Sequence, residues 1–221
     1  MPRFLNSFII SACVLGTLLL AGCTSNGVRV PKLPAKSYQP QNVYSLEYIP
    51  ATMIRVAVLP SYHPEEDPAL LQNFDSTINS ELSKVQIFEL IPIDRAYLKK
   101  HFGTSQINST SNLPASLLAR IVRDYQAQGV LFTDVTEYHP YKPIRVGLRS
   151  KLVDLRDGEL IWVFDDVFDS AQPNVSAAAR RYSRQVFTDR FPLDSADSML
   201  QSPQRFSRYV FHEAFETMPS R

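Results

Sequence analysis

A histidine and three carboxylates stand almost together in the chain, at His63, Glu65, Glu66 and Asp67. Such a set can serve as a general acid and base. The apolar run before it predicts a buried strand, and ligands of α/β folds gather at strand ends. Asp67 followed by Pro68, however, is typical of a helix N-cap, and charged loops are usually solvated. We therefore expect no active site here, and a peptidoglycan-acting hydrolase that uses His63 and Glu65 remains an alternative.

Other catalytic and metal-binding patterns are weak. Asp165, Asp166 and Asp169 have the ligand type of hard cations, but successive strand residues point to opposite faces, so Asp165 and Asp166 do not readily share a metal. The chain has only seven glycines and lacks the P-loop, Gly-x-Gly-x-x-Gly and Gly-x-Ser-x-Gly motifs. None of the four histidines is paired at metal-ligand spacing; they are His63, His101, His139 and His212. We predict a protein that is not an enzyme and that has no catalytic residue, metal or cofactor.

Cys23 is the residue to which the sequence assigns definite chemistry. Arg3 supplies a positive end, Phe8 to Leu20 are mostly apolar, and small residues follow, as in secretory signals. The apolar stretch is shorter than the roughly 20 residues that a spanning helix needs. Leu20-Ala21-Gly22-Cys23 resembles the lipobox of bacterial lipoproteins. The resemblance implies that residues 1–22 are a signal peptide and that Cys23 receives a diacylglyceryl group on its sulfur.

The lipobox also implies a location. Asp commonly follows the cysteine in lipoproteins kept in the inner membrane, and here Thr24 follows it. The expected place is the periplasmic face of the outer membrane, where two or three acyl chains hold a protein firmly. Without residues 1–22, which contain Arg3 and Cys13, 22 basic residues balance 22 acidic ones. That balance argues against nucleic-acid binding and gives no reason to expect electrostatic adhesion to lipid headgroups.

Beyond the lipobox, residues 23–50 are predicted to be a lipidated, proline-rich tether, and residues 51–221 a single α/β domain. Alternatively, residues 43–49 alternate in polarity and dock on the domain as an edge strand. We predict Gly129 as the stop of one helix and Asn174 as the cap of another. The apolar periodicity predicts strands at 53–59, 86–91, 130–138, 144–152 and 160–168, and helices at 68–82, 95–102, 117–125, 175–186 and 203–214. This order indicates an α/β (α+β) fold with a mixed, mostly five-stranded sheet and packed helices.

Three stretches of the domain carry a family resemblance: residues 55–60, residues 128–133 and the hairpin at 152–162. They resemble a group of envelope proteins that includes the TolB N-terminal domain, the curli secretion lipoprotein CsgG and the penicillin-binding-protein activator LpoB. In that group the hairpin often reads D…TGE…W, and here Asp157 stands in place of Thr. The resemblance covers about residues 53–170. It implies a TolB-like domain that acts as a binding, assembly or regulatory component of an envelope complex. A structural ring subunit of a secretion or motility apparatus remains an alternative.

Two sets of residues could bind an envelope protein partner. Phe211 and Phe215 lie off the main apolar stripe of the last helix; core packing is favoured for both, and the alternative is an exposed aromatic patch that would mark a partner-binding interface. The second set is favoured as a solvated charged surface, and the alternative is contact with an anionic cell-wall polymer or an acidic partner. It consists of Arg180, Arg181, Arg184, Arg190, Arg205 and Arg208, interleaved with Asp189, Asp194 and Asp197.

Overall fold

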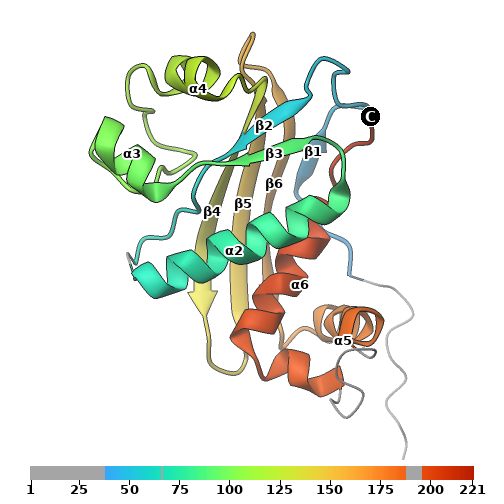
Figure 1. Ribbon diagram of the computed structural model, residues 1–221. Coiled ribbons are helices and arrows are strands. Elements are labelled where there is room, and N and C mark those ends of the chain that lie inside the picture. The colour runs from blue at the N-terminus through green and yellow to red at the C-terminus, as the bar shows by residue number, and fades with distance from the viewer. Residues whose placement is uncertain (1–37, 66, 188–195) are drawn as a thin grey trace, which may run out of the picture. The chain divides into compact units, whose positions relative to one another are not determined.

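A mixed six-stranded sheet forms the centre of the domain (Figure 1). The computed structural model describes residues 38–65, 67–187 and 196–221. The strand order is β1-β6-β5-β4-β2-β3; β2 runs parallel to β3 and β4, and the other neighbours are antiparallel. The bounds are β1 Val43–Ser45, β2 Arg55–Val58, β3 Glu89–Pro92, β4 Gly129–His139, β5 Arg145–Asp154 and β6 Leu160–Asp169. The predicted fold class is confirmed, with six strands in place of five.

Two helices begin at the caps that the sequence predicts. Asp67 accepts a hydrogen bond from the Ala69 N–H at 2.9 Å, and Asp94 accepts one from the Ala96 N–H at 2.8 Å. Each cap satisfies a backbone donor that the helix itself leaves without a partner. The helices are α2 Pro68–Val85, α3 Arg95–Phe102, α4 Leu117–Tyr125, α5 Pro173–Phe187 and α6 Pro203–Phe215, with the short 3-10 helix η1 at Ala196–Leu200.

Two predicted helix boundaries are wrong. α4 ends because Gln126 takes the left-handed conformation, with φ 53°. Gly129 is instead the first residue of β4, where a Cβ would lie 2.9 Å from Met53 Sδ. Glycine is needed there for close packing and does not stop the helix. α5 begins at Pro173, so Asn174 lies inside its first turn and is not its cap.

The segment before the domain is bound to the edge of the sheet. Val43 to Ser45 pair with Trp162 to Phe164 of β6, as the edge-strand alternative proposes. Tyr38 and Ile49, on either side of β1, are both buried. The expected tether therefore does not extend to residue 50, and residues 23–37 lie outside the described part of the chain.

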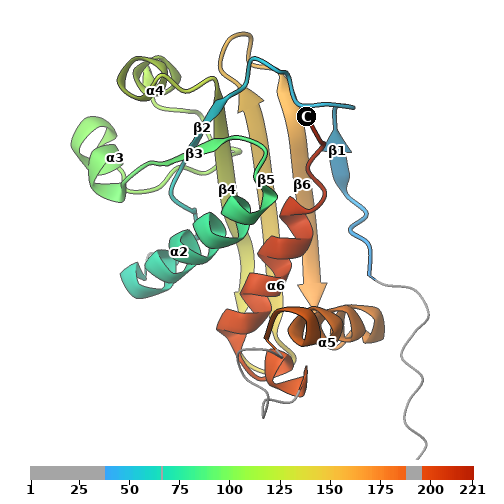
Figure 2. The same ribbon diagram turned by 45° about the vertical axis from the view of Figure 1, so that its right-hand side comes forward.

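Helices pack on both faces of the sheet (Figure 2). On one face, α2, α5 and α6 cover β4, β5 and β6, and the main core contains Trp162, Phe164 and Tyr209. On the other face, a second core joins α3 and α4 to β2 and β4. Adjacent residues of β4 belong to different cores, because successive side chains point to opposite faces. Within the described residues, no helix is both long enough and apolar enough to span a membrane.

Candidate functional site

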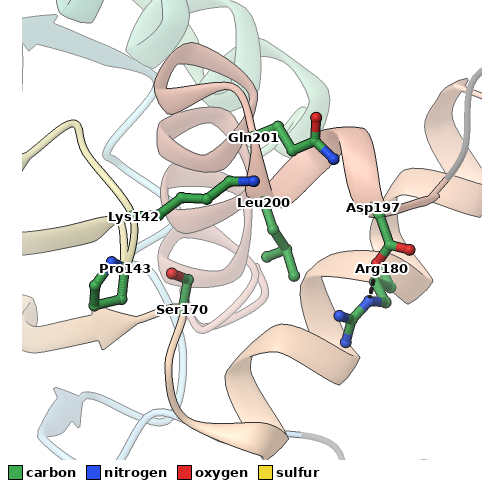
Figure 3. A pocket seen from close by; sticks show the side chains of 7 residues that line it. All are labelled: Lys142, Pro143, Ser170, Arg180, Asp197, Leu200 and Gln201. Carbon is green, nitrogen blue, oxygen red and sulfur yellow. Dashed lines mark hydrogen bonds and ion pairs between the residues drawn. The ribbon is translucent and has the colours of Figure 1, made fainter.

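A cavity of about 520 Å³ lies where β4 turns into β5 and where β6 ends (Figure 3). Its volume falls in the range of about 300–1,000 Å³ that is usual for small-molecule sites. Its walls come from the β4–β5 turn, the residue after β6, α5, η1 and the residue after η1. The lining residues are Lys142, Pro143, Ser170, Arg180, Asp197, Leu200 and Gln201.

Two cations and one carboxylate determine the charge of this cavity. Arg180 Nε donates to Asp197 Oδ1 at 2.6 Å, and Arg180 Nη1 reaches Ser176 Oγ at 3.4 Å. Within the described residues, Lys142 Nζ makes no hydrogen bond or ion pair. The hydroxyl of Ser170 and the carboxamide of Gln201 add neutral polar groups. Because Asp197 offsets only one of the two cations, the arrangement favours an anionic group.

Hydrogen bonds fix the two turns that carry part of this lining. His139 Nδ1 lies 2.9 Å from the Tyr141 carbonyl oxygen and 3.2 Å from that of Pro143. The Ser170 N–H donates to the Ile144 carbonyl oxygen at 2.9 Å. Lys142 and Ser170 are therefore brought together although 28 residues separate them, because β5 and β6 are neighbouring strands.

The opposite wall is held by the contacts of η1. Met199 is fully buried, and the guanidinium of Arg205 donates to Ser198 Oγ at 2.7 Å. The Ser202 N–H donates to the Ser198 carbonyl oxygen at 3.2 Å, which joins η1 to the start of α6. Leu200 and Gln201 thus reach the cavity from a segment that is packed in place.

The predicted arginine set does not form one patch. Arg180 pairs with Asp197 in the cavity, whereas Arg208 Nε lies 3.4 Å from Oε1 of the buried Glu81 on α2. Arg205 is bound to η1 as described above. Asp189, Arg190 and Asp194 lie outside the described residues. Of the predicted set, Arg180 and Asp197 line the cavity.

The structure bears out core packing for Phe211 and Phe215, and the alternative of an exposed, partner-binding aromatic patch is wrong. Phe211 and Phe215 are 0% and 1% exposed. The ring of Phe211 meets the edge of Phe74 on α2 at 6.1 Å between centroids, and Phe215 lies 6.2 Å from Trp162 of β6. α6 contacts both α2 and the sheet, so its apolar face is wider than a single stripe. Both residues belong to the core.

The structure separates the predicted His63 cluster. His63 is 6% exposed, and its Nδ1 lies 2.8 Å from the Val135 carbonyl oxygen. Its backbone exchanges two hydrogen bonds with the Gln106 carboxamide. Glu65 is exposed, and Asp67 caps α2. His63 therefore has a structural role in the core, and no hydrogen bond or ion pair joins it to Glu65.

The three aspartates of β6 have separate partners. Asp165 accepts from Arg149 Nε at 2.7 Å on one face of the sheet. Asp166 accepts from the Tyr38 hydroxyl at 2.8 Å, and burial together with this bond raises the pKa of Tyr38. Asp169 accepts from the Ala171 N–H at 2.8 Å. In the described part of the chain, no three His, Cys, Asp or Glu side chains are grouped so that they could hold a metal ion.

Two predicted residues lie outside the described part of the chain: Cys23, with the rest of its lipobox, and Glu66. Conversely, sequence reasoning missed Lys142, Ser170 and Gln201 as lining residues. They belong to turns, and only the strand register and the packing of η1 bring them together. One sequence signal could have found Lys142. It lies between Pro140 and Pro143, directly before a predicted strand, and such a position indicates a cation in an exposed turn.

No protein-family model matches the chain, and a search of curated proteins finds no match. Several solved structures are similar in fold. A PelC dodecamer from Paraburkholderia phytofirmans has a TM-score of 0.45 and 13% identity, covering 81% of this chain and 96% of that chain. Lipoprotein GNA1162 from Neisseria meningitidis has a TM-score of 0.40 and 18% identity, covering 60% and 95%. The LpoB C-terminal domain from Escherichia coli has a TM-score of 0.33 and 18% identity, covering 52% and 82%.

Proposed function

We propose that the protein is an outer-membrane lipoprotein on the periplasmic face, whose domain binds another component of the bacterial envelope in an assembly or regulatory role. The observation that carries this proposal is Leu20-Ala21-Gly22-Cys23 at the end of a signal-like apolar run. Lipidated at Cys23, the mature chain would begin fifteen residues before Tyr38, the first residue with a described contact. The anchor would thus keep the domain close to one membrane.

A binding role, in place of an enzymatic one, is supported by how reactive side chains are used. His63 is buried against the Val135 carbonyl oxygen. Asp134 is buried and accepts from the Ser109 hydroxyl at 2.6 Å, and burial raises its pKa. These groups hold the loop between α3 and α4 and the β2–α2 loop to the sheet. The cavity beside Lys142, in contrast, offers polar groups to a ligand.

The test of the anchor is replacement of its cysteine. In cells that express the full chain, Cys23→Ser should move the protein from the membrane fraction to the soluble fraction or leave it unprocessed. Cys13→Ser is the matched control, because Cys13 lies in the part that the signal peptidase removes, and it should leave membrane attachment unchanged. Processed Cys23→Ser protein that stays with the outer membrane would contradict the proposal.

The test of the binding role uses photoreactive amino acids at exposed positions on different faces. Tyr141 lies in the β4–β5 turn, Tyr44 on the open side of β1, and Leu113 before α4. Crosslinking in intact cells should give one discrete envelope product from one of these faces and not from all three. Purified protein that cleaves peptidoglycan, with cleavage lost in His63→Ala with Glu65→Ala, would favour the hydrolase alternative.

A further inference from the structure

The cavity beside Lys142 lies at the same end of the sheet as Tyr38, the first described residue after the predicted anchor. Tyr38 donates to Asp166, and its ring packs on Phe168 with centroids 4.9 Å apart. Both partners are among the last residues of β6, just before Ser170 in the cavity wall. The opposite end of β6 is roughly 30 Å away, at about 3.4 Å per strand residue. The described chain therefore begins at the cavity end of the sheet.

Chain length limits how far this end can be from the acyl chains. Fifteen residues separate Cys23 from Tyr38, and a fully extended chain of that length spans about 50 Å. An unstructured chain of the same length would average about 20 Å. A lipid anchor on Cys23 would therefore allow the cavity to reach the phospholipid headgroups.

The surface around the cavity suits such a contact. Tyr141 is 76% exposed at the tip of the β4–β5 turn, next to Lys142. Tyrosine is favoured at membrane–water interfaces, because its ring is apolar and its hydroxyl is polar. Lys142 and Arg180 present an ammonium and a guanidinium, both of which bind phosphate oxygens. The cavity is also larger than a bare ion requires, so it can take a headgroup.

We propose that this cavity binds the phosphate headgroup of an anionic phospholipid in the membrane that holds the anchor. Lys142 and the terminal nitrogens of Arg180 contact the phosphate, Ser170 and Gln201 contact the polar part of the headgroup, and Tyr141 lies in the interface beside it. The inference rests on the proposed lipid anchor, which brings the membrane to this end. It adds a second, lipid-selective contact that orients the tethered domain.

The test uses protein purified from membranes of cells that express the full chain, reconstituted into phosphatidylcholine vesicles with or without phosphatidylglycerol. A phosphatidylglycerol analogue with a photoreactive headgroup labels what it contacts, and mass spectrometry maps the label. We expect labelling at the β4–β5 turn or near Gln201, with competition by unlabelled phosphatidylglycerol and not by phosphatidylcholine. Soluble glycerol phosphate in excess separates the two sources of phosphate: it should compete weakly, because it brings no interface for Tyr141.

Substitutions assign the label to the cavity. Lys142→Gln and Arg180→Gln should each lower labelling about fivefold, the effect of one cation near an anionic surface. Lys142→Gln breaks no described contact, so it tests the proposal even if Arg180→Gln loosens Asp197. Lys100→Gln on α3 and Arg123→Gln on α4 are matched controls, since both side chains are exposed on helices away from the cavity (Figure 1). Both should label as the unchanged protein does.

Several outcomes would overturn the inference: labelling spread evenly over the domain, unchanged labelling in Lys142→Gln, or equal competition by phosphatidylcholine. Binding to purified peptidoglycan that depends on Lys142 while vesicle labelling does not would assign the cavity to the cell wall. Failure of the lipid-anchor proposal is recognised by a separate measurement. In that case Cys23→Ser fractionates with membranes as the unchanged protein does, whatever the labelling pattern.

Discussion

Glu213, on α6, links protonation to stability. Burial raises its pKa to about 7, helped by the nearby Glu216 and opposed by Arg181. A carboxyl group whose pKa is higher in the folded state than in the unfolded state takes up a proton on folding. Its contribution to stability is complete below the ordinary value of 4.5 and is lost as the pH rises through about 7.

We therefore expect Glu213→Gln to retain stability at pH 8 that the unchanged protein loses between pH 5 and pH 8, roughly 1–3 kcal/mol. Urea unfolding at both pH values measures this. His212 acts in the opposite sense, because burial lowers its pKa below 6.5 and stability is lost as the pH falls. The quantity to compare is thus the difference between variant and unchanged protein. Parallel stability curves would show that Glu213 does not titrate as described.

Phe211 shows why a residue type and its spacing do not settle whether a side chain is exposed. Because it is fully buried against Phe74, Phe211→Ala should lower the free energy of unfolding by about 3–5 kcal/mol. Tyr141→Ala, at a position 76% exposed, should change it by about 0.5 kcal/mol or less. Denaturant titration distinguishes the two. A small effect at Phe211 would mean that α6 is less tightly packed than the structure has it.

Only some of the residues that line the cavity could be predicted from the sequence. Arg180 and Asp197 stand in a charge-rich stretch, and interleaved charges at once suggest ion pairs or a binding surface. Lys142 and Ser170 have no pattern between them; the β5–β6 register brings their turns together. That register cannot be read from one sequence alone, because the pairing of distant strands depends on how the whole sheet packs.

Among the elements, β1 is the one that the sequence left undecided. Its three residues are too few for alternation to outweigh the prolines around it, yet Asn42 and Leu46 hydrogen-bond to β6 on either side. The longer strands β4, β5 and β6 and the capped helices α2 and α3 were predictable, because ten or so periodic residues or a cap give a strong local signal. The helix stop at Gln126 was not predictable, since a non-glycine residue takes the left-handed conformation there.

Tyr44 tests the pairing of β1. It lies opposite Val163 and is 51% exposed, so its side chain adds little to the core. Tyr44→Pro should detach β1, because proline has no N–H and fixes φ. We expect faster hydrogen exchange of the Asp165 amide, which donates to the Asn42 carbonyl oxygen, and earlier proteolysis between residues 38 and 50. Tyr44→Thr keeps the N–H and should leave both unchanged. Unaltered exchange in Tyr44→Pro would mean that β1 does not depend on this pairing.

For the molecule as a whole, net charge proved a poor guide to local chemistry. Basic and acidic residues balance after residue 22, and several of these charges are paired in the structure, as are Arg95 with Asp75 and Arg149 with Asp165. Within the described residues, Lys142 belongs to no such pair. Its positive charge is therefore available to attract an anionic ligand. A protein whose charges balance overall can therefore still concentrate positive charge at one place on its surface.

The boundary between anchor segment and domain sets the last prediction. Tyr38 and Ile49 are buried and β1 pairs with β6, so the folded unit includes residues that the sequence alone assigned to the tether. A chain that begins at residue 38 should unfold at the same urea concentration as one that begins at residue 23. A chain that begins at residue 51 loses two buried side chains and a strand, and should be less stable by at least about 3 kcal/mol.

Equal urea midpoints for the chains beginning at residues 38 and 51 would show that residues 38–50 contribute nothing to the stability of the domain. A lower midpoint at 38 than at 23 would place stabilising contacts before Tyr38.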